Sequence, residues 1–471
     1  MWKVIFMNST MKEENKKVSL GNMTKDMTVG NPKRIILSFG VPLLLGMLFQ
    51  QFYSMVDTII VGRFLGVDEL AGVGSTGAIN FMVIGFCMGI CNGFAIPIAQ
   101  CFGARDYKNL RKYVANCVWL SVIFAVLMTT VVSVFCRDIL KLMDTPSDIF
   151  EYAYEYIFII FLGIPVIFLY NILSGIIRAL GDSRVPLIFL IISSVINIVL
   201  DFVTIKWFNM SVNGPALATV ISQGISGVLC LIYMIKKYDV LHVKKGEWRP
   251  EKHHMVTLCR MGIPMGLQYS ITAIGSVILQ TAVNSLGSTA VASVTAANKV
   301  SMFFCCPFDA MGSTMATYAG QNIGAGKPDR VTKGMLSCSV MGLIYSAAAC
   351  AVLVIFGRQL ASIFIDKSEA GNGEILQNAR LMLIWLSSFY FPLSLVNIIR
   401  FTIQGLGYSE LAILSGVCEM AARALVGFVF VPMWGFIAVC TASPMAWILA
   451  DIFLITAYIF VIKRVKRETS H

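Results

Sequence analysis

Twelve long apolar stretches follow one another along the chain, and short polar segments separate them. A helix that crosses the hydrocarbon core of a bilayer needs about 20 apolar residues, so each stretch predicts a transmembrane helix. The stretches run over residues 34–62, 72–100, 113–135, 150–177, 186–206, 214–235, 257–285, 289–319, 334–357, 376–400, 411–431 and 435–462. Several exceed the minimal length, which predicts tilted or bent helices. The pattern as a whole predicts an all-α polytopic membrane protein with twelve transmembrane helices.

The second half of the chain repeats motifs of the first half. The Gly-Val-Pro motif that ends at Pro42 returns as Gly-Ile-Pro ending at Pro264. Further positions recur in the same order: Leu65, Gly66, Ala71, Gln100, Gly103 and Ala104 as Leu286, Gly287, Ala292, Gln321, Gly324 and Ala325, and then, after a short insertion in the second copy, Asn171, Leu180, Gly181 and Ser183 as Asn397, Leu406, Gly407 and Ser409. Six helices per copy give both copies the same orientation, so two parallel six-helix lobes around a central cavity are expected. This architecture is typical of secondary transporters, although a duplicated channel or membrane enzyme shares it.

The repeat divides the chain into five parts. We expect an N-terminal tail at 1–33, a first lobe at 34–235, an inter-lobe loop at 236–256, a second lobe at 257–462 and a basic tail at 463–471. Of 37 basic residues, 28 fall on the cytoplasmic side if the N-terminus is cytoplasmic, and this count places Arg178 and Arg400 in loops. Such a bias predicts that both termini are cytoplasmic in a multi-pass protein of the cell membrane. The net charge of +11 then requires no nucleic-acid partner.

Composition excludes several classes of protein. Hydrophobic residues make up 57% of the chain and charged residues only 13%, too little charge for a soluble protein of this length. The 13 cysteines lie mainly in apolar runs without a Cys-x-x-Cys pair, which favours buried free thiols over a zinc site. We find no zinc-protease motif, no Gly-rich nucleotide loop and no Asp-rich diphosphate motif. The sequence therefore predicts neither an enzyme nor a cofactor, and no cleaved signal peptide.

Four polar residues of the first lobe are predicted to share one layer of the membrane. Asp57 and Asp201 each lie five residues before the outer end of a predicted span, and Thr219 lies five residues after the start of the next. At 1.5 Å per residue all three are about 7 Å below the outer ends of their helices. Asn197 precedes Asp201 by one helical turn on the same face. Oxygen ligands suit a hard cation and paired carboxyls can share a proton, so we expect a Na⁺ or H⁺ site. The alternative is hydrogen bonding that only holds the lobe together.

The second lobe lacks an equivalent set, which predicts one coupling site per chain. The repeat pairs Asp57, Asn197, Asp201 and Thr219 with Ile278, Arg423, Gly427 and Cys440, respectively. Glu419 and Arg423 are four residues apart on one helix, an arrangement that favours an ion pair with a structural role. Lys299 and Arg423 are the two basic residues predicted inside the spans. For Lys299 and Asp451, structural pairing or a polar lining is the expectation.

Other residues are candidates for the cavity and for gating. Ionisable side chains inside a span are costly and point to function, so Asp309 is expected to face the central cavity and attract cations. Gln268 and Met302 are further candidates for the cavity lining, although methionine is also an ordinary residue of membrane helices. Pro42 lies 15 residues before Asp57 on the first helix. A proline removes a backbone hydrogen bond and permits a kink, which makes Pro42 either a gate or a static packing kink.

These motifs resemble the multidrug and toxic compound extrusion (MATE) transporters over residues 34–462. The motifs that carry the resemblance are Val-Asp-Thr-Ile-Ile-Val-Gly at 56–62 after Pro42, Gln-Cys-Phe-Gly-Ala-Arg at 100–105 with its repeat Gln-Asn-Ile-Gly-Ala-Gly at 321–326, Arg-Ala-Leu-Gly-Asp-Ser-Arg-Val-Pro at 178–186, and Asn-Ile-Val-Leu-Asp at 197–201 with Thr219. The resemblance implies twelve helices in two lobes and antiport of organic cations and other toxic compounds against Na⁺ or H⁺. NorM-like members carry acidic ligands in the second lobe, whereas this chain has Gln268, Ser270 and Thr272 on the seventh helix. It is therefore more similar to the DinF- and MepA-like branches.

The sequence as a whole predicts a monomeric multidrug efflux antiporter in the lipid bilayer, with drugs and organic cations as cargo. A lipid-linked oligosaccharide flippase of the same superfamily is the alternative. Such a protein would need several Arg or Lys residues in the cavity to hold a pyrophosphate, and five acidic residues against two basic ones inside the spans favour cationic cargo. A polytopic membrane enzyme is a further, weaker alternative.

Overall fold

A computed structural model describes residues 25–365 and 372–469 of the chain, and helices make up nearly all of this part. The first half contains α2 (Pro32–Phe64), α3 (Val67–Ser75), α4 (Gly77–Gly103), α5 (Tyr107–Val134), α6 (Cys136–Leu142), α7 (Phe150–Leu162), α8 (Ile164–Ala179), α9 (Arg184–Lys206) and α10 (Asn213–Lys237). The second half contains α11 (Lys252–Asn284), α12 (Ser288–Gly324), α13 (Pro328–Ala361), α14 (Asn372–Ser388), α15 (Tyr390–Gly405), α16 (Ser409–Leu425), η4 (Val426–Phe430), α17 (Val431–Trp434) and α18 (Phe436–Thr469). The short helices η2 (Asp239–Leu241) and η3 (Lys245–Trp248) lie between the halves.

The helices account for twelve membrane spans. Ten spans are long and apolar enough on their own, and two more are bent pairs, α7 with α8 at 48° and α14 with α15 at 50°. The bends fall at Gly163 and at Phe389. These two positions are separated by the same number of residues as the repeat partners Asn171 and Asn397, so the two bends are related by the repeat. A proline follows each break within three residues, and its missing N–H weakens the helix there. The predicted all-α fold with twelve spans and bent helices is confirmed.

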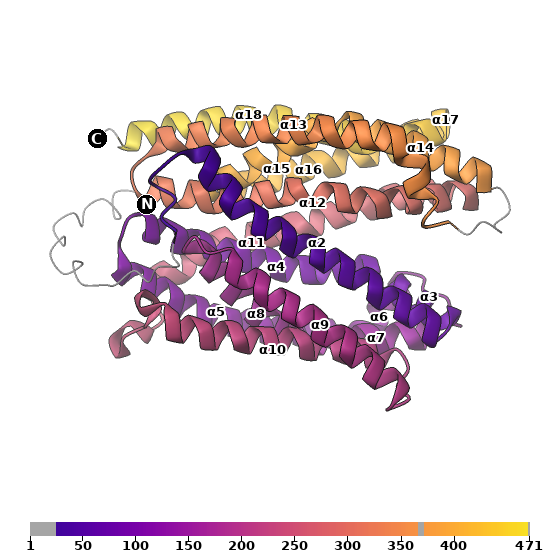
Figure 1. Ribbon diagram of the computed structural model, residues 1–471, viewed down its shortest axis with the longest axis horizontal. Coiled ribbons are helices and arrows are strands. Elements are labelled where there is room, and N and C mark those ends of the chain that lie inside the picture. Colours follow the sequence, from indigo (N-terminus) through magenta and orange to yellow (C-terminus); the bar gives the residue numbers. More distant parts are fainter. Residues whose placement is uncertain (1–24, 366–371, 470–471) are drawn as a thin grey trace.

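Two bundles with separate apolar cores form the two lobes (Figure 1). The first helix of each half crosses from one lobe to the other. Phe39 of α2 packs in a buried cluster with Tyr318 and Ile398 of the second lobe, whereas the far end of α2 packs on α9 of the first lobe. In the same way, α11 begins against α4 of the first lobe and continues along α16 of the second. Gly93 permits this approach, because a Cβ there would lie 2.5 Å from the Cα of Gly262.

The lobes meet at one end of the bundle, which we call the closed end. Gln100 donates to the carbonyl oxygen of Gly405 at 3.0 Å, and Gln321 donates to that of Ala179 at 2.8 Å. Because Gln100 and Gln321 are repeat partners, these hydrogen bonds are related by the pseudo-symmetry of the lobes. The described chain also begins and ends at this end (Figure 1).

Residues 25–31, which we call the N-terminal strap, cross the closed end. Met27 is fully buried, and its N–H donates to Gln321 Oε1 at 2.9 Å. The side chains of Asn322 and Arg330 donate to the carbonyl oxygen of Met27, so the strap is attached to the second lobe. Its Asp26 pairs with Arg105 of the first lobe at 3.6 Å. The segment 1–33, predicted as a tail, is thus ordered against both lobes over residues 25–33, while residues 1–24 lie outside the described residues.

The inter-lobe segment 236–256 is folded onto the first lobe. Arg111 of α5 donates two hydrogen bonds of 2.8 Å to the carboxylate of Glu247, and Trp119 of α5 donates to the carbonyl oxygen of Trp248. Lys112 pairs with Glu251 at 2.6 Å. After the second lobe, α18 continues to Thr469 and so includes most of the predicted tail at 463–471.

Candidate functional site

Asp57, Asn197, Asp201 and Thr219 come together in the first lobe, and we call this group the carboxylate site. Asp57 and Asp201 lie within electrostatic reach of each other, and the amide of Asn197 donates to the hydroxyl of Thr219 at 3.4 Å. Counted from the ends of α2, α9 and α10, Asp57, Asp201 and Thr219 lie about 7–11 Å inside. The shared layer follows from helix lengths that match across the lobe.

The carboxylate site contains buried oxygens without hydrogen-bond donors. Among the described residues no partner is found for Asp57 Oδ1, Asn197 Oδ1 or either carboxylate oxygen of Asp201. Asp201 and Asn197 are almost completely buried. A buried polar oxygen without a donor costs free energy, so several in one place favour a bound cation or proton. Ion binding by this group stays a prediction, and the alternative is that the group only supports the lobe.

Three further side chains surround the carboxylate site and were absent from the sequence prediction. Tyr53 lies on the face of α2 that carries Asp57 and within electrostatic reach of it, and Gln223 of α10 lies near Tyr53. Tyr156 of α7 lies within electrostatic reach of both Asp57 and Asp201. The spacing of four residues between Tyr53 and Asp57, and between Thr219 and Gln223, was the available signal. Nothing in the sequence indicates Tyr156, because it comes from a separate span.

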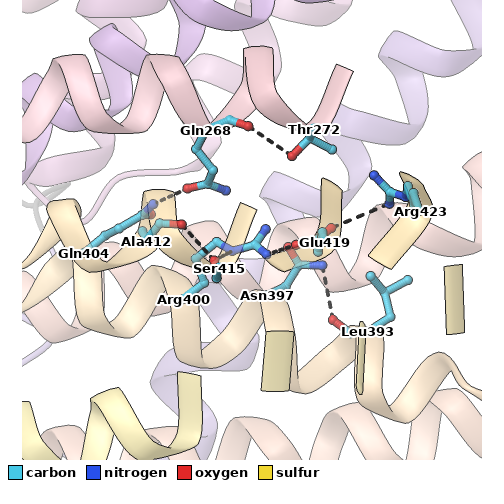
Figure 2. Close-up of polar contacts among 10 residues, drawn as sticks. All are labelled: Gln268, Thr272, Leu393, Asn397, Arg400, Gln404, Ala412, Ser415, Glu419 and Arg423. Atoms are coloured by element: carbon cyan, nitrogen blue, oxygen red, sulfur yellow. Dashed lines mark hydrogen bonds and ion pairs between the residues drawn. The ribbon is translucent and has the colours of Figure 1, made fainter. Parts of the chain in front are cut away.

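A group of buried charged residues occupies the second lobe, and we call it the charge cluster. Figure 2 shows Glu419 of α16 between two guanidinium groups, Arg400 of α15 and Arg423 one turn further along α16. The Glu419–Arg423 separation is 3.5 Å, so the predicted ion pair is present. Arg400 also donates to Ser415 Oγ at 2.9 Å. Asp451 of α18 is buried within electrostatic reach of Arg400 and Glu419.

The placement of Arg178 and Arg400 in loops is wrong. Arg178 lies in the last turn of α8 and donates to Asn92 Oδ1 of α4 at 3.1 Å, and Arg400 is buried in the interior of α15. The predicted spans ended at 177 and 400. Because each boundary was drawn at a charged residue, the arginine was counted with the loop instead of with the helix. Inside the lobes, basic side chains are therefore more numerous than Lys299 and Arg423, and the electrostatic preference for cations is weaker than predicted.

The candidate cavity residues separate into two groups. Asp309 and Met302 of α12 are both exposed and lie seven residues apart, which places them on one face of the helix. Gln268 of α11 is buried instead and accepts a hydrogen bond of 2.7 Å from Gln404 (Figure 2). The structure therefore does not place Gln268 at the cavity surface. Lys299, also exposed on α12, has its ammonium 5.8 Å from the ring of Phe364.

Two further expectations concern the gating helix and metal binding. Pro42 lies inside α2, which continues through it as one helix. Within the described ranges no group of three or more His, Cys, Asp or Glu side chains could hold a metal ion, and each described cysteine has a free thiol.

Comparison with known proteins identifies the class. The MatE family model matches residues 42–203 and 264–429. These two matches begin at the repeat partners Pro42 and Pro264, and their ends have the same offset as Asn171 and Asn397, so the family model recognises both copies of the repeat. A probable multidrug resistance protein, YoeA of Bacillus subtilis, is 30% identical over 74% of this chain and 76% of its own. The multidrug export protein MepA of Staphylococcus saprophyticus is 24% identical over 81% and 84% of the two chains.

A solved structure supports the same assignment for the fold. It is described as the outward-facing conformation of a multidrug resistance MATE family transporter of the MOP superfamily. The TM-score is 0.87 at 22% identity, with 95% of this chain and 99% of that chain covered. The fold with two six-helix lobes is thus that of a solved MATE family structure. The chain belongs to the MATE family and is a transporter, not an enzyme.

Proposed function

We propose that the protein exports organic compounds, mostly cations, in exchange for Na⁺ or H⁺, and that the carboxylate site couples the two movements. The observation that carries the proposal is the neighbouring pair Asp57 and Asp201, with buried oxygens that lack donors within the described part of the chain. Two negative charges at short range repel strongly where the dielectric constant is low. A proton or a Na⁺ ion removes that repulsion, and the oxygens of Asn197 and Thr219 add ligands that a hard cation prefers.

The first helix links ion binding to the arrangement of the lobes. α2 carries Asp57 near one end and packs through Phe39 on the second lobe near the other. Pro42 lies between the two, where α2 lacks one backbone hydrogen bond and bends more easily. Binding of an ion changes the charge at Asp57 and so changes the most stable position of α2 relative to α9. The contact of α2 with the second lobe then weakens or strengthens with occupancy of the carboxylate site.

Cargo binds in the cavity between the lobes. Asp309 presents a carboxylate on the exposed face of α12, and Met302 lies two turns away on that face. A carboxylate attracts an organic cation, and a flexible thioether adapts to varied apolar surfaces. In this proposal the protein lies in the cell membrane and acts as a monomer. The closed end and both termini face the cytoplasm, and the cavity opens to the outside of the cell.

The test is efflux of ethidium from proteoliposomes under Na⁺ and proton gradients that are imposed separately. We expect one of the two gradients to drive efflux by the wild type. Asp57→Asn and Asp201→Asn should reduce efflux to the rate seen without a gradient, because an amide has no negative charge for a proton or a Na⁺ ion to neutralise. Efflux at the wild-type rate by either variant would refute the coupling role of the carboxylate site.

Two controls distinguish coupling from a structural role. Asp451→Asn removes a buried carboxylate of the second lobe, and its efflux should keep the same ion dependence, since the site is single. The midpoint of thermal unfolding of Asp57→Asn and Asp201→Asn should stay close to that of the wild type. A large fall in that midpoint would support the alternative in which these groups only hold the lobe together.

A lipid-linked oligosaccharide flippase is the second candidate, and the guanidinium groups of Arg178 and Arg400 favour it, because a pyrophosphate requires basic partners. Arg400 is already paired with Glu419, so of these two arginines Arg178 is the one available for such a headgroup. The proteoliposome assay separates the two candidates, since a flippase would not export ethidium under any ion gradient.

A further inference from the structure

A pocket lies between the lobes near the closed end. Helices of both lobes line it, with Asn92 and Arg178 from the first lobe and Met265, Ser313, Thr317 and Phe401 from the second. The pocket therefore exists only where the two lobes meet, and any movement of one lobe against the other changes it. The conformational change of transport would therefore directly alter the contacts of a ligand bound in this pocket.

Arg178 brings to this pocket a positive charge that has no carboxylate partner among residues 25–365 and 372–469. In the described part of the chain its hydrogen-bond acceptors are neutral, namely Asn92 Oδ1 at 3.1 Å and Ser174 Oγ at 3.3 Å. The ionisable groups that influence it are tyrosines and cysteines, with no Asp or Glu among them. Arg400, by contrast, is neutralised by Glu419. A guanidinium remains charged in proteins and has five donors, so Arg178 retains donors for an anionic group.

The opposite charge lies on α12, a second-lobe helix that also lines the pocket. Asp309, Ser313 and Thr317 of α12 follow one another at intervals of four residues and so share one helix face. Asp309 lies about 6 Å along the axis from the Ser313 level and about 12 Å from the Thr317 level. Tyr269 of α11 lies within electrostatic reach of both Asp309 and Arg178. The face of α12 thus has an acidic region at Asp309 and a hydroxyl-lined region at Ser313 and Thr317. The hydroxyl-lined region meets the basic Arg178 of α8 in the pocket.

We propose that Arg178 forms an anion subsite of the transport cavity, which takes the carboxylate of amphoteric cargo while the cationic part of the same molecule lies toward Asp309. The inference rests on the proposed export function and specifies its cargo as organic cations that also carry a carboxylate. A planar carboxylate matches the two parallel donors of a guanidinium. Arg178 is here a binding residue, and Asn92 positions it.

The experiment compares a rhodamine dye that has a free carboxylate with the methyl ester of the same dye. Binding to the full-length protein in detergent is followed by fluorescence polarisation without any ion gradient. We expect the wild type to bind the acid about tenfold more tightly than the ester, which corresponds to one charge-assisted interaction. Equal affinities for the acid and the ester would overturn the proposal.

Three variants locate the preference. Arg178→Gln removes the charge, and Asn92→Asp retains Arg178 but supplies an internal carboxylate beside it, so each should bind acid and ester equally. Asn92→Asp keeps the packing of α8, which preserves the test if Arg178→Gln does not fold. Arg260→Gln is the matched control, because Arg260 is exposed and pairs with Glu410 away from the pocket, and it should keep the tenfold preference. A preference that persists in Asn92→Asp would refute the subsite.

The outcome is separable from that of the proposed function. If no gradient drives efflux but the acid is still preferred through Arg178, the antiport proposal fails and the subsite stands. If efflux is driven by a gradient but acid and ester bind equally, the subsite alone fails.

Discussion

Glu419 holds two guanidinium groups in the interior of the second lobe. Its carboxylate contacts Arg400 and, at 3.5 Å, Arg423, and all three side chains are buried. A buried ion pair adds little compared with apolar packing, but the loss of one partner leaves an uncompensated charge, which costs about 3–5 kcal/mol. The role of Glu419 in this cluster is therefore mainly to permit two arginines at positions away from water.

Glu419→Gln should accordingly destabilise the protein by about 3–5 kcal/mol, measured as a fall in the midpoint of thermal unfolding in detergent. Glu410→Gln is the matched control, since Glu410 pairs with Arg260 at an exposed position, where loss of an ion pair costs about 1 kcal/mol or less. Equal effects of the two substitutions would show that the charge cluster does not depend on Glu419.

The sequence was sufficient to group Asp57, Asp201 and Thr219, because depth along a helix can be counted from its end. It was not sufficient for Arg178 and Arg400. Hydropathy treats a basic residue beside an apolar run as the end of the span, whereas each helix continues past its arginine. The partners that accept the arginines, Asn92 and Glu419, come from other helices, so no local pattern records the contact.

The helices themselves were predictable, but the positions of the bends were not. Pro42, Pro97, Pro264, Pro307 and Pro444 all lie inside continuous helices, since packing against neighbouring helices compensates for one lost hydrogen bond. The two breaks occur at Gly163 and Phe389. Proline in the sequence therefore indicates a weak point, and tertiary packing decides whether the helix bends there.

The N-terminal strap gives a prediction for one such element. Gln321 accepts from the N–H of Met27 and donates to the carbonyl of Ala179. Gln321→Ala leaves both groups without a partner, at about 1–3 kcal/mol each. Amide hydrogen exchange over residues 25–31 should then accelerate about tenfold or more. The control is Gln359→Ala, at an exposed position of α13, which should leave exchange unchanged. Unchanged exchange in Gln321→Ala would mean that other contacts attach the strap.

The inter-lobe segment provides a prediction that depends on pH. Burial raises the pKa of Glu247, but the Arg111 guanidinium and the Lys244 backbone N–H lower it more, so the pKa lies below its usual value of 4.5. A lowered pKa means that Glu247 stabilises the fold at pH values above 4.5 and that this contribution is lost as pH falls through the folded pKa.

Glu247→Gln should therefore lower the free energy of unfolding by about 1–3 kcal/mol near neutral pH. The difference from the wild type should shrink as pH falls below the usual glutamate pKa. The measurement is the midpoint of thermal unfolding of both proteins across this range. A difference independent of pH would mean that packing of the side chain, rather than its charge, attaches η3 to α5.

At the scale of the whole molecule, the closed end depends on two repeat-related glycines. A Cβ on Gly103 would lie 1.9 Å from the carbonyl oxygen of Gln321, and a Cβ on Gly324 would lie 1.9 Å from that of Gln100. Both obstacles are backbone atoms of the opposite lobe, which cannot move aside without separating the lobes. The pseudo-symmetry therefore places two equivalent steric limits at the same interface.

Gly103→Ala and Gly324→Ala should each shift the lobes apart at the closed end, because the added methyl group has no room while the lobes touch. The readout is the distance between genetically encoded spin labels at Lys108 and Lys333, which are exposed on α5 of the first lobe and α13 of the second; the chain's 13 cysteines make thiol labelling unspecific. Each variant should move the distance distribution to longer values.

Gly74→Ala is the matched control, since its Cβ would meet nothing within 4 Å. The two variants should also resemble each other, because the repeat makes their contacts equivalent. An unchanged distribution in both would mean that the closed end relieves the clash by local backbone shifts and that these glycines do not set the spacing of the lobes.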